Sequence, residues 1–228
     1  MQKRKYVSVA IDGPSGAGKS TLAKRMAAEL GFLYVDTGAI YRTIGYYAHT
    51  HGIDSRQEEA VTATLPDIRV EIAYGEDGLQ HMLLNGQDVT EEIRMPRISL
   101  CASAVSAYPQ VRKFLLEMQR KLARDHNVIM DGRDIGTVVL PDADLKVFLT
   151  ASPEARAARR CLELEQRGCP QPYEQVLSEI QQRDWSDIHR EIAPLRQAAD
   201  AVELDTTTLD FEQSLSALLA LVREVIER

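Results

Sequence analysis

Residues 13–20 read Gly-Pro-Ser-Gly-Ala-Gly-Lys-Ser, which is the pattern G-x-x-x-x-G-K-[ST] of a phosphate-binding loop. A short apolar run at 6–11 precedes the loop, and residues 19–30 follow it with a helical pattern. The glycines let the backbone curl so that several N–H groups point at one anion, and the next helix adds the positive end of its dipole. This strand–loop–helix order favours a nucleoside triphosphate site over the alternative, a glycine-rich turn without a ligand.

Two side chains of the loop carry the predicted chemistry. Lys19 can reach the β- and γ-phosphates of a triphosphate, and the Ser20 hydroxyl can bind Mg²⁺. Asp36, at the end of the next apolar run, is a second candidate for the metal and would act through a water molecule. We therefore expect Mg²⁺ as a cofactor.

Length and composition narrow the class of protein. The 228 residues fit one α/β domain with insertions or two small domains, and 44% hydrophobic with 27% charged residues is ordinary for a globular protein. A net charge of −7 argues against binding a nucleic-acid polymer. The basic residues 1–5 lead into an apolar run too short for a signal peptide, and no run approaches the ~18 residues of a membrane span. Three cysteines without a CxxC pair indicate a reducing compartment, so a cytoplasmic location is expected.

Apolar runs alternate with helical patterns along most of the chain. The runs predicted as buried strands are residues 6–11, 32–35, 128–130, 145–149 and 201–204. The stretches predicted as helices are 19–30, 41–52, 98–107, one from Pro109 with an apolar face at Val111, Phe114, Leu115, Met118 and Leu122, one from Pro153, 173–189 and 210–227. This alternation predicts an α/β fold of three layers, with a parallel sheet of about five strands between helices.

Residues 66–94 break this alternation. Polar and apolar residues alternate at 67–72, a turn is predicted at 75–78, and Asn85-Gly86 is a strong hairpin signal. The segment therefore predicts a small antiparallel sheet inserted into the parallel fold.

Polar residues gather where two of the predicted parallel strands end. Residues 36–42 follow the second strand and include Arg42, and residues 131–137 follow the third and include Arg133 and Asp134. Ligands bind at the carboxyl ends of strands in open α/β sheets. We expect these two segments to face the phosphate loop.

Arginines also gather in the region between the fourth and fifth strands. Arg156, Arg159 and Arg160 are spaced by three and four residues, and Arg183, Asp187 and Arg190 by four and three, so each set shares a helix face. A helical pair carrying them could close as a lid over transferring phosphates. The alternative is that these arginines only pair with the many acidic residues. Arg112, near the start of a helix where a cation is disfavoured, is a further candidate, with a solvated surface position as the alternative.

No residue set in the sequence suggests a general base for a hydroxyl acceptor. An acceptor that is itself a phosphate needs none, because its oxygen is already nucleophilic. Two rival functions stay open at this point. One is a kinase of the same fold acting on another nucleotide or a hydroxylated metabolite. The other is a nucleotide switch, although the guanine-reading pattern Asn-Lys-x-Asp is absent from the sequence.

Three segments together resemble the bacterial cytidylate kinase family of P-loop nucleoside monophosphate kinases. They are Gly-Pro-Ser-Gly-Ala-Gly-Lys-Ser-Thr at 13–21, Asp-Thr-Gly-Ala-Ile-Tyr-Arg at 36–42 and Asp-Gly-Arg-Asp-Ile-Gly-Thr at 131–137. The inserted segment at 66–94 also resembles that of the bacterial branch, and the resemblance covers nearly the whole chain. It implies transfer of the ATP γ-phosphoryl group to CMP or dCMP by a monomer. It also implies one P-loop kinase domain over 1–228, with a monophosphate-binding region at 37–126 and a lid at 153–192.

The resemblance further implies roles for individual residues. ATP would be held by Gly13, Pro14, Ser15, Gly16, Ala17, Gly18, Lys19, Ser20 and Thr21, and CMP by Thr37, Arg42, Ser103, Arg112, Arg133, Asp134, Arg183, Asp187 and Arg190. The residues implied in catalysis are Lys19, Arg133, Arg156, Arg159 and Arg160. Family members commonly have Ser at the position of Thr37, and the hydroxyl is kept. Trp185, Ser186 and Ile188 replace residues that are usually polar or charged, which bears on the contacts of the lid.

Overall fold

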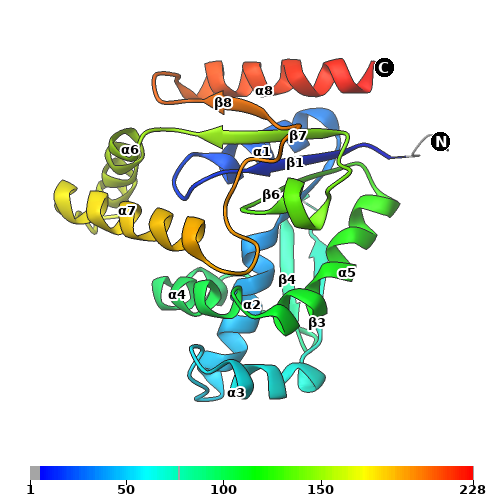
Figure 1. The fold of residues 1–228 in the computed structure, drawn as a ribbon, viewed down its shortest axis with the longest axis vertical. Coiled ribbons are helices and arrows are strands. Elements are labelled where there is room, and N and C mark those ends of the chain that lie inside the picture. The colour runs from blue at the N-terminus through cyan, green and yellow to red at the C-terminus, as the bar shows by residue number, and fades with distance from the viewer. Residues whose placement is uncertain (1–5, 77, 228) are drawn as a thin grey trace.

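A computed structural model describes residues 6–76 and 78–227 of the chain, so the predictions for residues 1–5 and for Asp77 lie outside the described residues. Five strands form one parallel sheet in the order β2-β6-β1-β7-β8, which confirms the predicted sheet (Figure 1). The strands are β1 (Ser8–Asp12), β2 (Leu33–Asp36), β6 (Val128–Gly132), β7 (Leu145–Thr150) and β8 (Val202–Asp205). Strand β2 lies at one edge of the sheet.

Helices connect these strands much as the apolar patterns predict. They are α1 (Lys19–Leu30), α2 (Thr37–Thr50), α3 (Glu58–Ala63), α4 (Pro96–Val105), α5 (Pro109–Asp125), α6 (Pro153–Gln166), α7 (Tyr173–His189) and α8 (Phe211–Ile226), with short helical turns η1 (Leu65–Asp67), η2 (Glu92–Arg94) and η3 (Ile135–Val139). Local sequence signals determine where several of these helices begin or end. Gly31 ends α1 with φ 67°, and Asp210 and Gln213 form a capping box at the start of α8.

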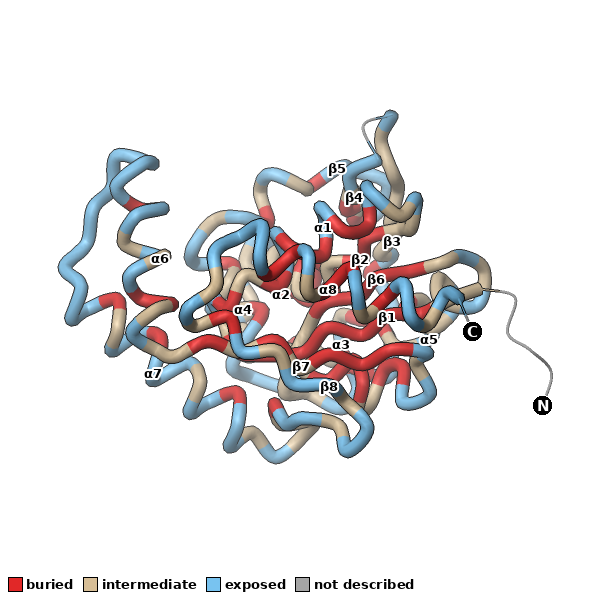
Figure 2. The backbone as a smooth tube through the Cα atoms, turned by 90° about the horizontal axis from the view of Figure 1, so that it is seen from above, coloured by how far each residue is buried: buried red, intermediate tan, exposed pale blue. Residues whose placement is uncertain are grey.

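The two faces of the sheet are covered by different helices. Val9 and Ile11 of β1 pack with α1 and α8, whereas Ala10 faces the opposite side, where α2, α4 and α5 lie. Figure 1 shows these layers, and Figure 2 shows the buried residues concentrated in the central strands. Alternate residues of a strand point to opposite faces, so these continuous apolar strands fill both interfaces.

The inserted antiparallel sheet is confirmed. It consists of β3 (Val70–Tyr74), β4 (Gln80–Leu84) and β5 (Gln87–Asp88). Met82, Leu84 and Val89 are buried in the same apolar cluster as α2, so the insertion shares the core on that side of the parallel sheet. Strand β4 also contacts β2, the edge strand.

Helices α6 and α7 form a pair with a small core of their own, made by Ala157, Leu164, Val176 and Ile180. Most other residues of the pair are exposed, as Figure 2 shows. The pair projects beside the carboxyl ends of the strands, where a lid was predicted. Among residues 6–76 and 78–227, no helix combines the length and apolarity that crossing a membrane requires.

Two predictions of helix detail were wrong. Helix α2 begins at Thr37, directly after β2, because the Asp36 carboxylate caps it by accepting from Ala39 N at 2.9 Å. On α5 the predicted apolar face includes Phe114, which is 39% exposed, while Arg112 and Gln119 are buried instead. The buried positions of α5 thus serve a polar site as well as the core.

Candidate active site

A cleft of about 530 Å³ opens at the carboxyl ends of the parallel strands. It brings together all but four of the predicted site residues, from six separate segments of the chain. Those lining it are Ser15, Gly16, Gly18, Lys19, Ser20, Thr21, Asp36, Thr37, Arg42, Ser103, Arg112, Arg133, Asp134, Arg159, Arg160, Arg183, Asp187 and Arg190. We call the part formed by residues 15–21 and the arginines of α6 that line the cleft the phosphate-loop end, and the part formed by Arg42, Arg112, Arg133, Asp134, Asp187 and Arg190 the arginine end.

Of the four predicted residues outside the cleft lining, three belong to the underside of the phosphate loop: Gly13, Pro14 and Ala17. Gly13 has φ 150°, and a Cβ placed there would lie 1.9 Å from the Leu149 carbonyl oxygen. Only glycine fits such an approach. These residues shape the loop so that its other members face the cleft.

Lys19 is buried at the phosphate-loop end, where its Nζ donates to the Pro14 carbonyl at 2.7 Å. Burial, together with the nearby Arg133, lowers the pKa of Lys19 to about 7, against the raising effect of Asp131. A group of this kind gains its full charge when an anion enters beside it.

Asp131, at the end of β6, is a functional candidate that the sequence interpretation left without a role. Its carboxylate accepts from Ser20 Oγ at 2.7 Å and from the Tyr34 hydroxyl at 2.7 Å. Burial and the neighbouring Asp36 raise its pKa. The sequence did carry a signal for this role, because an acid directly follows the apolar run 128–130. The structure places that acid beside the Ser of the phosphate loop.

The structure gives Asp36 a different task from the predicted metal contact. One carboxylate oxygen caps α2, and the other accepts from Arg42 Nη2 at 2.7 Å. Both oxygens are thus already used by protein groups. The pair fixes Arg42 at the edge of the cleft.

Asp134 and two arginines form a cluster at the arginine end. Arg112 Nη2 donates to Asp134 Oδ2, and Arg190 Nη2 donates to Asp134 Oδ1 at 3.3 Å. Arg112 is 8% exposed and also donates to the Ser106 carbonyl at 2.9 Å, which rules out the solvated alternative. Burial raises the pKa of Asp134, although Arg112 and Arg190 oppose the shift. Ser103 lies on the cleft wall formed by α4.

A second ion pair links the sheet to α7. Arg133 Nε donates to Asp187 Oδ2 at 2.7 Å. Burial raises the pKa of Asp187, but Arg133 and the neighbouring arginines outweigh it and hold that pKa below its usual value. Thr37 lies close by, donating its hydroxyl to the Asp131 carbonyl at 2.8 Å. Arg183 lines the cleft one turn before Asp187, as the helical spacing predicts.

The three arginines of α6 differ in surroundings. Arg156 is buried and lies outside the cleft lining, donating to Asp184 at 2.6 and 3.0 Å and to the Ser15 carbonyl at 2.9 Å. Arg159 lines the cleft and bonds to the Thr206 carbonyl. Arg160 is exposed and pairs with Glu163 at 2.9 Å. Arg156 and Arg160 therefore both pair with acidic residues, and Arg159 and Arg160 are the two arginines of α6 that line the cleft.

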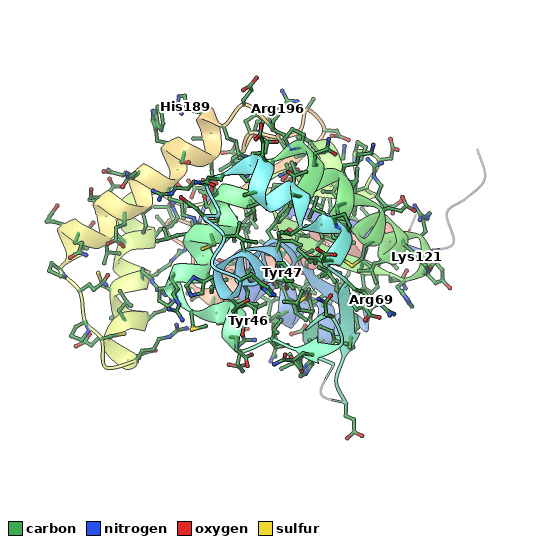
Figure 3. All side chains as sticks on the ribbon, turned by 90° about the horizontal axis from the view of Figure 1, so that it is seen from below. Tyr46, Tyr47, Arg69, Lys121, His189 and Arg196 are labelled. Atoms are coloured by element: carbon green, nitrogen blue, oxygen red, sulfur yellow. The ribbon has the colours of Figure 1, made fainter. Side chains whose placement is uncertain are left out.

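The unusual residues of α7 lie on its outer side. Trp185 is 65% exposed and stacks on His189 at 4.5 Å between ring centroids, and Ile188 is 50% exposed. Figure 3 shows His189 at the end of α7, pointing away from the body of the protein. Ser186 is also exposed. These departures leave the cleft side of the helix unchanged.

Asp12 is a buried acid for which the sequence offered no role. Its two carboxylate oxygens accept from the backbone N–H groups of Ile135 and Gly136, both at 2.7 Å. Burial raises the pKa of Asp12 to about 6, against the lowering effect of these hydrogen bonds. The side chain ties the end of β1, directly before the phosphate loop, to the turn that follows Arg133 and Asp134.

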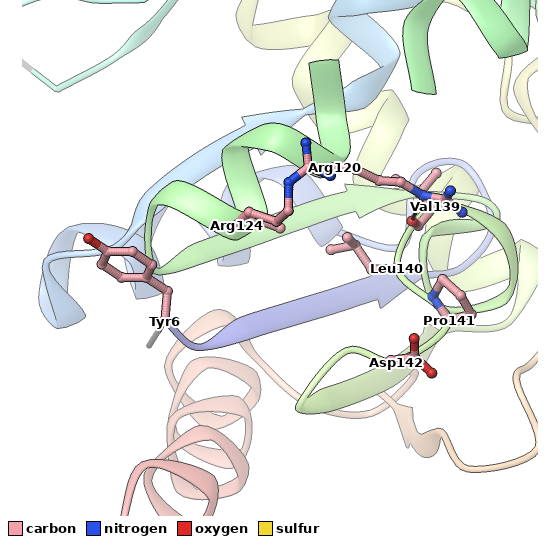
Figure 4. Close-up of a pocket in the computed structure, with 8 residues that line it drawn as sticks. Tyr6, Arg120, Arg124, Val139, Leu140, Pro141 and Asp142 are labelled. Carbon is pink, nitrogen blue, oxygen red and sulfur yellow. Dashed lines mark hydrogen bonds between the residues drawn. The ribbon is translucent and has the colours of Figure 1, made fainter. Parts of the chain in front are cut away.

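A second pocket, of about 490 Å³, lies beside α5 and away from the cleft (Figure 4). Its two arginines are occupied. Arg120 donates to the Val138 and Val139 carbonyls at 3.0 and 2.9 Å, and Arg124 pairs with Glu117. None of the predicted site residues lines this pocket, so the cleft remains the candidate active site.

Comparison with known proteins agrees with the motifs and the geometry. A sequence model of the cytidylate kinase family matches residues 9–224. A protein named cytidylate kinase from Caldicellulosiruptor saccharolyticus is 50% identical over 224 residues, covering 97% of this chain and 98% of the relative. One from Bacillus cytotoxicus is 46% identical over 224 residues, covering 98% and 99%.

Among solved structures, an uncharacterized protein from Eubacterium ventriosum has a TM-score of 0.52 at 11% identity, covering 98% of this chain and 100% of that one, which supports the fold alone. The phosphate loop, the paired arginine end and the match along nearly the whole sequence lead to one assignment. The chain belongs to the cytidylate kinase family.

Proposed function

We propose that this protein transfers the γ-phosphoryl group of ATP to CMP or dCMP, giving ADP and CDP or dCDP. The observation that carries the proposal is the cleft itself. One end is a phosphate loop, and the other holds arginines that are already paired and oriented around Asp134 and Asp187. Two anionic ligands can therefore meet in one cavity, with the transferred group between them.

ATP is assigned to the phosphate-loop end. Residues 13–21 would form the loop around its phosphates, with backbone N–H groups of the residues that line the cleft as donors, and Lys19 would contact the β- and γ-phosphates. Arg159 and Arg160 would approach from α6. We assign Arg156 a supporting role, because its hydrogen bonds hold α7 and the phosphate loop together.

The metal is proposed to be Mg²⁺, held by Ser20 and Asp131. Their oxygens lie 2.7 Å apart and are the hard ligands that Mg²⁺ prefers. Residues 6–76 and 78–227 contain no cluster of three or more His, Cys, Asp or Glu side chains able to hold a metal, so phosphate oxygens and water would complete the shell. When bound, the ion would offset the negative charge of the triphosphate. Asp131 thus takes the place first predicted for Asp36.

CMP is assigned to the arginine end. Thr37, Arg42, Arg133 and Arg190 would hold its phosphate, and Arg183 and Asp187 its sugar hydroxyls. Asp134 would accept from the N4 amine of cytosine, while Arg112 and Ser103 donate to the base. Uracil presents a carbonyl oxygen at that position, which the Asp134 carboxylate repels. The arrangement favours CMP and dCMP over UMP.

The reaction then needs position and charge rather than a general base. An oxygen of the CMP phosphate attacks the γ-phosphorus, the bond from this phosphorus to the β–γ bridging oxygen breaks, and ADP leaves. Lys19, Arg133, Arg159 and Arg160 would offset the charge on the transferred group. Water must be excluded, which we assign to the lid at 153–192, while 37–126 forms the monophosphate-binding region of one domain over 1–228. We expect a cytoplasmic monomer.

A coupled assay of ADP release tests this function. Purified protein is given ATP and Mg²⁺ with CMP, dCMP, UMP, AMP or GMP in turn, or with hydroxylated metabolites such as gluconate. ADP release that depends on CMP or dCMP, with at least ~10-fold lower rates for UMP, is expected. ADP release independent of every acceptor would contradict the proposal.

A further inference from the structure

The inserted antiparallel sheet touches the active site through one pair of side chains. Tyr74 of β3 and Gln80 of β4 are direct cross-strand partners, and both reach the backbone of the edge strand β2. The Tyr74 hydroxyl donates to the Tyr34 carbonyl at 3.0 Å. The Gln80 side-chain amide accepts from Asp36 N at 2.7 Å and donates to the Asp36 carbonyl at 3.3 Å.

These hydrogen bonds resemble those of a neighbouring strand. An amide that both accepts from and donates to one residue satisfies its backbone as a paired strand would. Strand β2 is at the end of the sheet, so without the insertion this side of Tyr34 and Asp36 would lack such partners. The contacts hold the point where β2 ends and α2 begins.

Asp36, held in this way by Gln80, in turn contacts a residue of the cleft. One of its carboxylate oxygens accepts from Ala39 N at 2.9 Å and the other from Arg42 Nη2 at 2.7 Å. Gly38 leaves room for the pair, since a Cβ there would lie 3.0 Å from Arg42 Nη1 and 3.1 Å from Asp36 Oδ1. Arg42 Nε is buried and finds no hydrogen-bond partner among the described residues. Arg42 is thus fixed on one side by Asp36, and its side chain lines the cleft.

We propose that Gln80 of the inserted sheet is a positioning residue that orients Arg42 through Asp36 for the acceptor phosphate. This inference rests on the proposed function of the arginine end. Gln80 touches no substrate in this account. Its two hydrogen bonds to the Asp36 backbone keep Asp36 in the conformation that caps α2 and holds the Arg42 guanidinium. Loss of the Gln80 side chain would therefore displace the contact between Arg42 and the acceptor phosphate rather than remove it.

Steady-state kinetics of Gln80→Ala tests the proposal, with Gln87→Ala as the matched control. Gln87 is the same residue type on the same small sheet, and it is exposed. We expect Gln80→Ala to raise KM for CMP by about fivefold to tenfold with KM for ATP within about twofold of the parent, since small displacements of a positioning group weaken the contact it sets. Gln87→Ala should leave both values unchanged. Equal changes in both KM values, or kinetics like those of the control, would overturn the proposal.

A double-substitution cycle separates positioning from general support of the fold. In an Arg42→Ala background, Gln80→Ala should raise KM for CMP no further, because the group it positions is gone. Full additivity would overturn the coupling. Should Gln80→Ala fail to fold, the isosteric Gln80→Glu keeps the acceptor for Asp36 N but replaces the donor by a charged oxygen that faces the Asp36 carbonyl, and the same KM pattern is expected. The unchanged protein is assayed first: absence of CMP-dependent ADP release there refutes the proposed function, whereas normal activity with an unaffected Gln80 variant refutes only this inference.

Discussion

The two ends of the cleft hold their charges in different ways. At the arginine end four cations pair with carboxylates: Arg42 with Asp36, Arg112 and Arg190 with Asp134, and Arg133 with Asp187. At the phosphate-loop end, Lys19 donates to a carbonyl of its own loop, and the exposed Arg160 pairs with Glu163 on its own helix. The arginine end is ordered by ion pairs with carboxylates, whereas Lys19 and Arg160 contact groups of their own loop and helix.

This difference indicates that the two ends of the cleft contribute to ligand binding in different ways. A guanidinium held by a buried carboxylate has lost its rotamer freedom before a ligand arrives, so binding does not cost that entropy again. Lys19 and Arg160 have weaker, local partners that an incoming phosphate can replace. We therefore expect the arginine end to be preorganised and the phosphate-loop end to be completed by its ligand and the lid.

The largest effect is expected at Lys19. Lys19→Met removes the cation that we propose meets the transferred phosphate, so kcat should fall by about 10²–10³-fold, the loss seen for a single transition-state donor. Rapid-quench or coupled kinetics measures it, with circular dichroism as a check on folding. A variant that keeps more than about a third of the parent kcat would show that the phosphate-loop end does not act through this side chain.

Substitutions of Arg156 and Arg160 should distinguish a loss of folding stability from a loss of catalytic rate. Arg156→Ala leaves Asp184 without its partner, and breaking a buried pair should lower the free energy of unfolding by about 3 kcal/mol. Arg160→Ala, which removes an exposed pair, should change it by less than about 0.5 kcal/mol while lowering kcat. Urea unfolding compares the two variants. Equal stability losses would contradict the different roles given to these arginines.

Asp134 tests whether the arginine end reads the base. Asp134→Ala should reduce the preference for CMP over UMP by about 10- to 100-fold in kcat/KM, because the acceptor for the N4 amine is gone. ATP binding should persist, which a fluorescent ATP analogue can report. Unchanged selectivity in this variant would refute the base-reading assignment.

A smaller, graded effect is predicted for the pH dependence of ATP binding. The pKa of Lys19 lies at about 7 in the free protein, below its ordinary value of 10.5, so the side chain is charged below pH 7 and loses its proton above it. The anion ATP prefers the charged form, and its affinity should weaken by up to about tenfold per pH unit above pH 7.

CMP affinity should stay level over the same range, since the arginines keep their charge. Titration calorimetry between pH 6.5 and 8.5 compares the two ligands. Lys19→Arg is the matched variant, and in it the slope for ATP should disappear. Parallel slopes for ATP and CMP would contradict the contrast between the two ends.

The sequence predicted the parts of the protein that local signals determine. Helix α1 was predicted end to end, since its apolar spacing and Gly31 mark both limits. The hairpin at Asn85-Gly86 and the capping box at Asp210 were likewise local. The candidate residues gathered in one cleft because the carboxyl ends of parallel strands share one edge of the sheet.

Partners far apart along the chain could not be predicted. Asp12 and Ile135 are separated by 123 residues, and Arg156 and Asp184 by 28. Spacing showed that Arg156, Arg159 and Arg160 share a side of α6, but not that Arg156 lies deep enough to meet Asp184. The start of α2 was placed too late, because Asp36 was read as a ligand-binding acid rather than as a cap.

Binding of CMP to the ATP-free protein tests most directly the central claim that the arginine end is a preorganised acceptor site. Isothermal titration calorimetry is run with and without a non-hydrolysable ATP analogue, and with UMP as the control ligand. We predict that CMP binds in the absence of the analogue, with a Kd that the analogue changes by less than about tenfold, or ~1.4 kcal/mol. Binding of CMP only after the analogue is present would contradict the account.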